Sequence, residues 1–143
     1  YKSALEFLTN ENFHGPQGSQ LAQARDDLAA ICWGNAAQAS LGGGDHMAAV
    51  VFATSAIKLV PHNPKFYFRR AKAYRHLSMF TEARQDITLA QECIGEAGSP
   101  MDQEAVRVEF DEINEDEARV QATSATTGGN NSTGSVNISH ESI

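Results

Sequence analysis

Apolar and small side chains recur along this chain at helical spacing, in segments separated by glycine and proline. Alanine is abundant, prolines number only four and aromatics make up 8% of the residues, a composition that favours packed helices over a sheet-rich fold. The pattern predicts helices over residues 21–41, 45–60, 65–77 and 81–94. Because the connection within each successive pair is short, the two helices of a pair should run antiparallel. We therefore predict an all-α fold.

Residues that disfavour a helix interior separate these segments. Gly42 to Gly44 should end the first helix, and Asp45 should cap the second. Pro61 to Pro64 should end the second helix, and Ser78 with Met79 should break the chain between the third and the fourth. The breaks thus divide the chain into helix pairs.

The chain also resembles itself after a shift of 34 residues. Alanine is the residue that recurs best, with Ala37 on Ala71, Ala49 on Ala83 and Ala56 on Ala90. Small side chains are needed where two helices approach closely, because a bulkier side chain would hold the axes apart. The repeat therefore predicts helix pairs that stack on one another.

This pattern resembles the tetratricopeptide repeat family. The residues that carry the resemblance are Ala37, Ala49, Ala56, Pro61, Tyr74, Phe80, Ala83 and Ala90. It implies an antiparallel helix-pair solenoid with a C-terminal capping helix, in which residues 30–63 and 64–97 are two full repeats. Ser40, His46 and Gly95 depart from the family's pattern.

The start of the chain resembles part of a further repeat. Residues 1–12 look like its second helix, with Tyr1 and Ala4 on signature positions, and residues 13–29 like an insertion and helix extension within a repeat domain of residues 1–97. Such an enlarged connection is similar to the tetratricopeptide domains of large immunophilins, of the FK506-binding and cyclophilin-40-like types. Because Tyr1 begins inside this helix, we expect a fragment of a longer protein, which the resemblance implies carries a prolyl isomerase domain.

The last part of the chain differs in charge from the rest. Residues 96–119 contain nine acids and two arginines, so their net charge of −7 (2 − 9) equals that of the whole chain. An imperfect apolar stripe predicts an acidic capping helix over residues 98–121, formed by Ala105, Val106, Val108, Phe110 and Ile113. Residues 122–143 have too little apolar content to fold alone, and we expect them to be disordered.

Five of the eleven basic residues lie between Pro64 and His76, with no acid among them. Lys65, Arg69, Lys72 and His76 are spaced i, i+4, i+7 and i+11, which predicts one basic helical face. The remaining two, Arg70 and Arg75, should point away from this face and form surface salt bridges, each contributing about 0 to 1 kcal/mol. In stacked helix pairs this basic face would line a groove beside Asn35 and Gln38, and such a groove would suit an anionic peptide. The alternative is that the basic face is only solvated.

The resemblance implies a specific role for this groove. In tetratricopeptide domains of the carboxylate-clamp type, an Asn, a Lys and an Arg bind the C-terminal Glu-Glu-Val-Asp peptide of heat shock protein 90 or 70 chaperones, and apolar groove residues read the Val. Asn35, Lys65 and Arg69 match those three positions, whereas two further clamp positions would lie before Tyr1. Gln38, Lys72 and His76 are candidates for secondary groove contacts.

Other chemistry is not indicated. The five histidines lack metal-ligand spacing, and the Gly-rich turn lacks the Lys of a phosphate loop. No spacing of Ser, His and Asp suggests a catalytic triad. We therefore expect no metal, no cofactor and no enzyme activity in this chain. A net charge of −7 disfavours nucleic acid. No apolar stretch suggests a membrane span. Cys32 and Cys93 lack the spacing of a disulfide framework or a zinc site, which favours a reducing compartment. We therefore expect a cytoplasmic location, and a nuclear one remains open.

Two other functions remain open from the sequence. A general scaffold could use the same groove for an unrelated helix or peptide, and a regulatory module could cover the active site of an attached catalytic domain. A second chain could also supply the missing first helix, through helix exchange or dimerisation at the N-terminal end.

Overall fold

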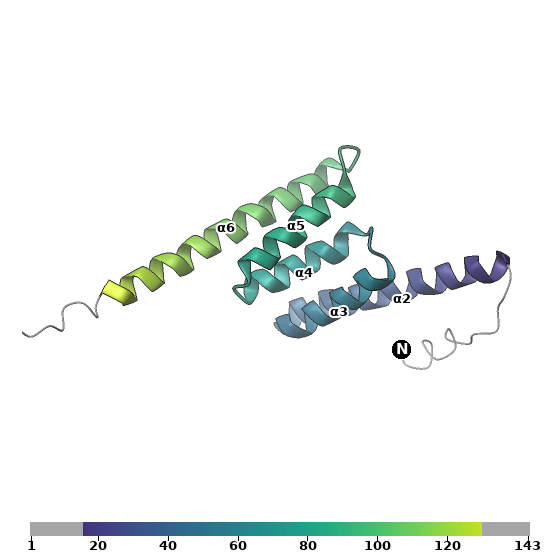
Figure 1. Cartoon of the computed structure of the whole chain (residues 1–143), viewed down its shortest axis with the longest axis horizontal. Helices are drawn as coiled ribbons and strands as arrows, with labels where there is room; N and C mark the ends of the chain where they lie inside the picture. The colour runs from purple at the N-terminus through teal and green to yellow at the C-terminus, as the bar shows by residue number, and fades with distance from the viewer. Residues whose placement is uncertain (1–15, 130–143) are drawn as a thin grey trace, which may run out of the picture.

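The computed structural model describes residues 16–129, and these residues form α-helices with no strand among them. The predicted all-α class is therefore confirmed. Figure 1 shows the helices, which are α2 (Pro16–Gly43), α3 (His46–Leu59), α4 (Pro64–His76), α5 (Phe80–Ile94) and α6 (Pro100–Gly129).

The first helix is longer than the sequence indicated. Helix α2 begins at Pro16 instead of residue 21, and Gly42 and Gly43 still belong to it. The turn is made by Gly44 alone, whose φ of +80° lies in the left-handed region that residues with a Cβ rarely adopt. The bounds of α3, α4 and α5 agree with the prediction to within one or two residues.

Side-chain caps determine where α3 and α4 begin. Asp45 Oδ1 accepts a hydrogen bond of 3.0 Å from the Ala48 N–H, as the sequence predicted. Asn63 Oδ1 accepts one of 3.0 Å from the Lys65 N–H, and Pro64 occupies the first helical position, where its missing N–H costs no hydrogen bond. Helix α4 ends at His76, and Ser78, whose φ is +59°, turns the chain away from the helical path two residues later.

The helices pack in an order consistent with a helical repeat solenoid. Helices α2 and α3 form one antiparallel pair and α4 and α5 another (Figure 1), while α3 packs on α4 and α5 packs on α6. Helices α2, α4 and α6 also contact one another in sequence, so every second helix lies along one side. The recurrent alanines are all fully buried, as expected for close helix contacts: Ala37, Ala49, Ala56, Ala71, Ala83 and Ala90.

Helix α6 continues beyond the predicted capping helix. Residues 122–129, which we expected to be disordered, are helical. Here each Ser or Thr hydroxyl bonds a carbonyl of the preceding helical turn, as Thr123 does to Arg119 and Thr127 to Thr123, so these side chains do not compete with the helix. The predictions for residues 1–12, and for the tail from 130 to 143, lie outside the described residues.

The buried stripe of α6 also differs from the predicted one. Val106 and Ile113 are buried as expected, but Val108 and Phe110 are exposed. The third buried position is Glu109, which is 2% exposed. An acid thus occupies the middle of the helix contact, because a cation on α4 meets it there.

Candidate functional site

Helix α4 carries the basic residues and lies between α2 and α6. Its apolar face is buried through Phe66, Tyr67, Ala71 and Ala73. Tyr67 is further held by its hydroxyl, which donates a hydrogen bond of 2.9 Å to the Pro61 carbonyl. The packed face therefore sets the direction in which each basic side chain leaves the helix.

Arg70 does not form the surface salt bridge that the sequence suggested. Its guanidinium donates two hydrogen bonds to Asp86 on α5, of 2.7 and 2.8 Å, and a third of 3.1 Å to Thr54 on α3. The side chains of Arg70 and Asp86 are only 17% and 4% exposed. This buried bidentate pair ties three helices together, and its charge is satisfied within the chain.

Arg75 is likewise enclosed rather than solvated. It bonds Glu109 at 2.7 Å, Glu112 at 2.8 Å and Asp116 at 2.9 Å, all on α6. Burial raises the pKa of the Glu109 carboxyl, and the positive charge of Arg75 opposes that rise. Arg75 thus docks α6 onto α4.

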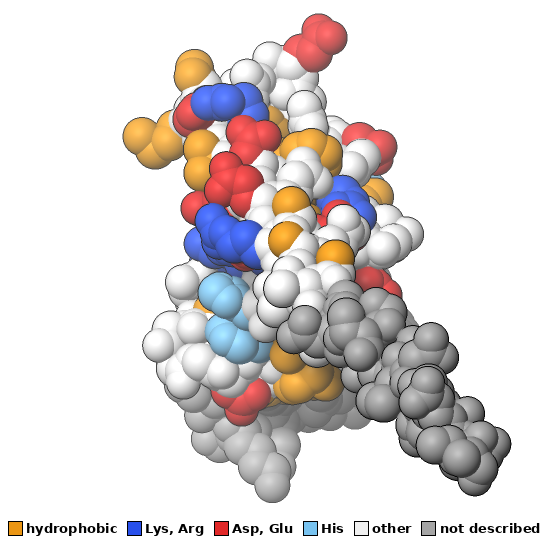
Figure 2. Space-filling view, turned by 90° about the vertical axis from the view of Figure 1, so that its left-hand side faces the viewer, with side chains coloured by type: hydrophobic (Ala, Val, Ile, Leu, Met, Phe, Trp, Pro, Cys, Tyr) orange, Lys and Arg blue, Asp and Glu red, His pale blue; other side chains and the backbone are white. Residues whose placement is uncertain are grey.

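Lys72 and His76, two of the predicted secondary groove contacts, also meet partners within the chain. The Lys72 ammonium lies 5.4 Å from the centre of the Phe68 ring, and its charge helps to lower the pKa of Glu109 against the effect of burial. The His76 ring stacks on His46, with centroids 4.4 Å apart. Figure 2 shows histidine side chains, in pale blue, touching one another at the surface below a mixed group of basic and acidic side chains. Peptide binding by Lys72 and His76 stays a prediction.

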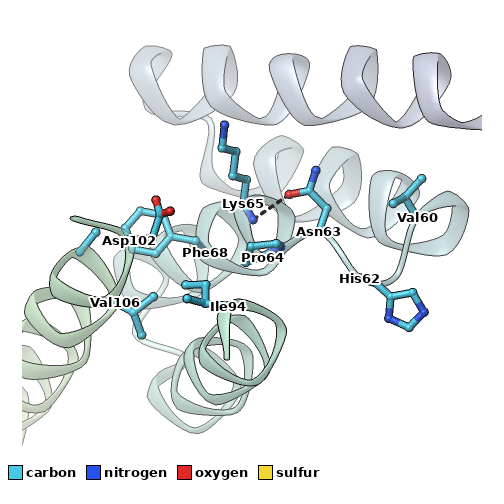
Figure 3. A pocket seen from close by; sticks show the side chains of 10 residues that line it. Val60, His62, Asn63, Pro64, Lys65, Phe68, Ile94, Asp102 and Val106 are labelled. Atoms are coloured by element: carbon cyan, nitrogen blue, oxygen red, sulfur yellow. Dashed lines mark hydrogen bonds between the residues drawn. The ribbon is translucent and has the colours of Figure 1, made fainter. Parts of the chain in front are cut away.

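Lys65 and Arg69 have different surroundings. Within the described part of the chain, neither side chain forms an ion pair. The Arg69 side chain is partly buried, and this burial lowers its pKa. Lys65 is exposed, and its side chain extends toward α2 (Figure 3). Both cations therefore lack the internal carboxylates that neutralise Arg70 and Arg75.

The predicted clamp asparagine directly follows the glycine that Arg69 contacts. The Arg69 guanidinium packs against Gly34 of α2, where a Cβ atom would lie only 2.9 Å from Arg69 Nη1. Asn35 follows Gly34 directly and is exposed, and Gln38 is exposed one helical turn later. The structure therefore brings Asn35 to the helical turn that Arg69 contacts; the roles of Asn35, Gln38, Lys65 and Arg69 in peptide binding stay predictions.

No protein-family model matches this chain, and a search of curated proteins finds no significant match. Among residues 16–129, no three His, Cys, Asp or Glu side chains are grouped so that they could hold a metal ion. No helix in the same part of the chain has the length and apolar character needed to cross a membrane. Cys32 and Cys93 are free thiols.

Sequence reasoning missed the internal partners of the arginines, although one signal was present. Arg75 and Glu109 are 34 residues apart, which is the period of the repeat. Equivalent positions of stacked repeats are neighbours in space. A cation and an acid one period apart therefore indicate an ion pair between two helices that occupy equivalent positions, here α4 and α6. The pair of Arg70 with Asp86 has no comparable signal, because their separation of 16 residues depends on how α4 and α5 turn against each other.

Proposed function

We propose that this chain is a tetratricopeptide-type co-chaperone module that binds the C-terminal Glu-Glu-Val-Asp peptide of heat shock protein 90 or 70 chaperones in the cytoplasm. Lys65 and Arg69 on α4 are the cations that would meet its carboxylates, and Asn35 on α2 is the amide that would hold its chain end. Docking would bring this module, together with any protein that carries it, to the chaperone's clients.

The observation that supports this proposal is that acids within the chain neutralise some basic residues of α4 and not others. Arg70 and Arg75 are paired with buried acids, whereas Lys65 and Arg69 have no acidic partner in the described chain. Partial burial of Arg69 removes some of its hydration, as the lowered pKa reflects. A ligand carboxylate would replace the lost hydration of the guanidinium by forming a bidentate charge-assisted hydrogen bond with it.

The spacing of the two cations also fits an extended acidic peptide. Lys65 and Arg69 are four residues apart, which is about 6 Å along the helix axis. In an extended chain, side chains on the same face are two residues and about 6.7 Å apart. The second Glu and the terminal Asp of Glu-Glu-Val-Asp have this relation, so one cation can meet each of them.

The test is a calorimetric titration of the chain with Met-Glu-Glu-Val-Asp as the free acid and as the C-terminal amide. A charge-assisted hydrogen bond contributes about 1.5 to 3 kcal/mol, so the amide and the variants Lys65→Ala and Arg69→Ala should each weaken binding by about ten- to a hundredfold. Lys58→Ala is the matched control, because it removes an exposed lysine from α3. Affinity should also fall as salt concentration rises.

Two results would contradict the proposal. One is equal affinity for the acid and the amide, and the other is no binding of either peptide. A loss of affinity in Lys58→Ala as large as in Lys65→Ala would show that net charge alone, and not the groove, attracts the peptide.

A general protein-interaction scaffold is a second candidate, and one observation favours it. Helix α2 exposes large apolar side chains at Leu21, Leu28 and Ile31, spaced so that they lie on one face. A partner helix on that face would bind without regard to terminal carboxylates. Binding of an apolar amphipathic helix that survives in Lys65→Ala and Arg69→Ala would therefore favour the scaffold.

A further inference from the structure

Helices α5 and α6 run side by side (Figure 1), and a groove of about 650 Å³ opens along their contact. This outer groove is formed by the second half of α5, the turn that follows it and residues 103–110 of α6, and no residue of α2, α3 or α4 lines it. Its volume lies within the range of about 300 to 1,000 Å³ that ligand sites have. The outer groove is therefore separate from the peptide site proposed on α2 and α4.

The floor of the outer groove is apolar. Val106 is buried there, whereas Phe110, one helical turn later, keeps 39% of its surface exposed. Residues four apart on a helix lie on the same face, so both side chains belong to the side of α6 that meets α5. The Phe110 ring thus offers apolar surface that a partner side chain can remove from water.

The turn between the two helices is held by its own chain. Gly95 has a φ of +63°, in the left-handed region that favours glycine. The side-chain amide of Gln103 donates hydrogen bonds to the backbone carbonyls of Glu96, at 3.3 Å, and Gly95, at 3.4 Å. The backbone of the turn is thereby satisfied, while the Glu96 side chain is exposed beside the groove.

Two acids lie where a helix favours cations. Glu92 belongs to the last turn of α5, and Glu96 follows two residues after the end of α5 at Ile94, although the C-terminal end of a helix carries a partial negative charge. Helices α3 and α4 instead have Lys58 and Arg75 in their last turns. Within residues 16–129, neither Glu92 nor Glu96 forms an ion pair. Cations of a partner would relieve this unfavourable arrangement.

Arg107 lines the outer groove, but acids of its own helix neutralise it. It pairs with Glu104 and Asp111, one turn before and one turn after it. Together with Glu92 and Glu96, these side chains carry a net charge of −3 (1 − 4). The outer groove therefore attracts a basic ligand and repels an acidic one.

We infer that the outer groove is a second interaction surface, which binds a short basic segment of a partner protein in which an apolar side chain lies between cations. The apolar side chain covers Phe110, and the flanking cations meet Glu92 and Glu96. Since no residue of the proposed peptide site lines this groove, the module can hold an acidic chain end and a basic segment at the same time. This inference goes beyond the proposed function and does not depend on it.

The experiment is a calorimetric titration with acetyl-Lys-Arg-Phe-Leu-Arg-Lys-amide, whose termini carry no carboxylate. A salt concentration of about 150 mM screens long-range attraction. Two matched peptides have Gln in place of every Lys and Arg, or Ser in place of Phe and Leu, and each should bind about fivefold more weakly or worse. Both peptides are needed because the groove combines charge with an apolar floor.

Two variants test the groove itself. Glu92→Gln with Glu96→Gln removes both carboxylates from the surface and should weaken binding of the basic peptide by about five- to tenfold. Phe110→Ser removes the apolar floor and should weaken it by about fivefold. Circular dichroism checks that Phe110→Ser keeps its helicity.

Each variant has a matched control outside the groove. Asp27→Asn with Glu115→Gln also removes two exposed acids, from α2 and from α6, and should leave the affinity nearly unchanged. Met101→Ser removes an apolar side chain that is 81% exposed on α6, and it should likewise have little effect.

Three results would overturn the inference. They are no binding of the basic peptide, equal affinity in the unmodified chain and in Glu92→Gln with Glu96→Gln, and a loss as large in Asp27→Asn with Glu115→Gln, which would mean that net charge alone attracts the peptide. Each of them leaves the proposed function standing, because that function is tested with acidic peptides and with residues of α4.

Discussion

Arg69 and Arg70 are neighbours in the sequence, yet their guanidinium groups meet different surroundings. Arg70 is held by Asp86 and Thr54, whereas Arg69 packs against Gly34 without an acidic partner in the described chain. Their side chains leave the helix about 100° apart, so one faces α5 and the other faces α2. At the scale of single residues, the partner that packing supplies decides whether a cation stabilises the fold or remains available to a ligand.

The buried pair of Arg75 and Glu109 gives a prediction at this scale. Arg75→Leu leaves the Glu109 carboxylate buried without its cation, and should lower the free energy of unfolding by about 3 to 5 kcal/mol. Urea denaturation followed by circular dichroism measures this change. The double variant Arg75→Leu with Glu109→Leu should recover most of the loss, because no charge is then left buried.

Arg107→Leu is the control for this prediction. Arg107 pairs with Glu104 and Asp111 on the exposed side of α6, so its loss should leave the free energy of unfolding nearly unchanged. If Arg75→Leu costs no more than Arg107→Leu, the ion pair does not hold α6 in place.

At the scale of helices, the close approach of α2 and α4 depends on one glycine. A methyl group on Gly34 would overlap the Phe66 ring and press on the Arg69 guanidinium. Phe66 is 3% exposed and packs with Ala30 and Ala56, so its ring has little room to move. The helix contact that buries this ring also places Arg69 against Gly34, the residue before Asn35.

Gly34→Ala should therefore destabilise the fold, although alanine is the better helix former. Overpacking of this kind costs about 1 to 3 kcal/mol in the free energy of unfolding. Gly42→Ala is the control, since a Cβ at Gly42 meets no atom within 4 Å and should add up to about 1 kcal/mol through helix propensity. Thermal denaturation of both variants decides the question, and a rise in Tm for Gly34→Ala would show that the two helices are less tightly packed.

At the scale of the whole molecule, the two helix pairs are joined at one end by the stacked histidines. His46 begins α3 and His76 ends α4, and within residues 16–129 no group forms a hydrogen bond with the buried Nδ1 of His46. The pKa of His76 lies below its ordinary value of 6.5, mainly because of burial and then because of His46 and the charge of Arg75. Lys72 also lowers this pKa, whereas Asp116 raises it. These surroundings therefore favour the neutral imidazole of His76.

This contact should make stability depend on pH. As the pH falls through 6.5, the unfolded chain takes up a proton on His76 before the folded chain does, so the free energy of unfolding decreases until the lower native pKa is passed. Above 6.5 this contribution is fully present. Urea denaturation between pH 8 and pH 5, at intervals of about half a unit, should show a weaker pH dependence for His76→Phe than for the unmodified chain.

His62→Gln serves as the control, because it removes an exposed histidine from the loop between α3 and α4. It should keep the pH dependence of the unmodified chain. An identical slope for His76→Phe and the unmodified chain would mean that His76 does not make the stability depend on pH.

Local patterns in the sequence were sufficient to predict the all-α class and most of the helix bounds. The helix propensity of alanine, the Asp45 cap and the breaks at Gly44 and Ser78 act within a few residues, so the amino-acid order alone determined these features. The end of α6 could not be predicted, because Ser and Thr hydroxyls can either bond the helix or compete with it.

The partners of the charges were decided only by the tertiary structure. The sequence indicated a basic face with Asn35 nearby, but Arg70 and Arg75 reach Asp86 and Glu109 only once α5 and α6 pack on α4. The outer groove likewise exists only where α5 and α6 meet. Helix formation depends on neighbours in sequence, whereas ion pairs and cavities depend on the angles and distances between helices, which no local pattern contains.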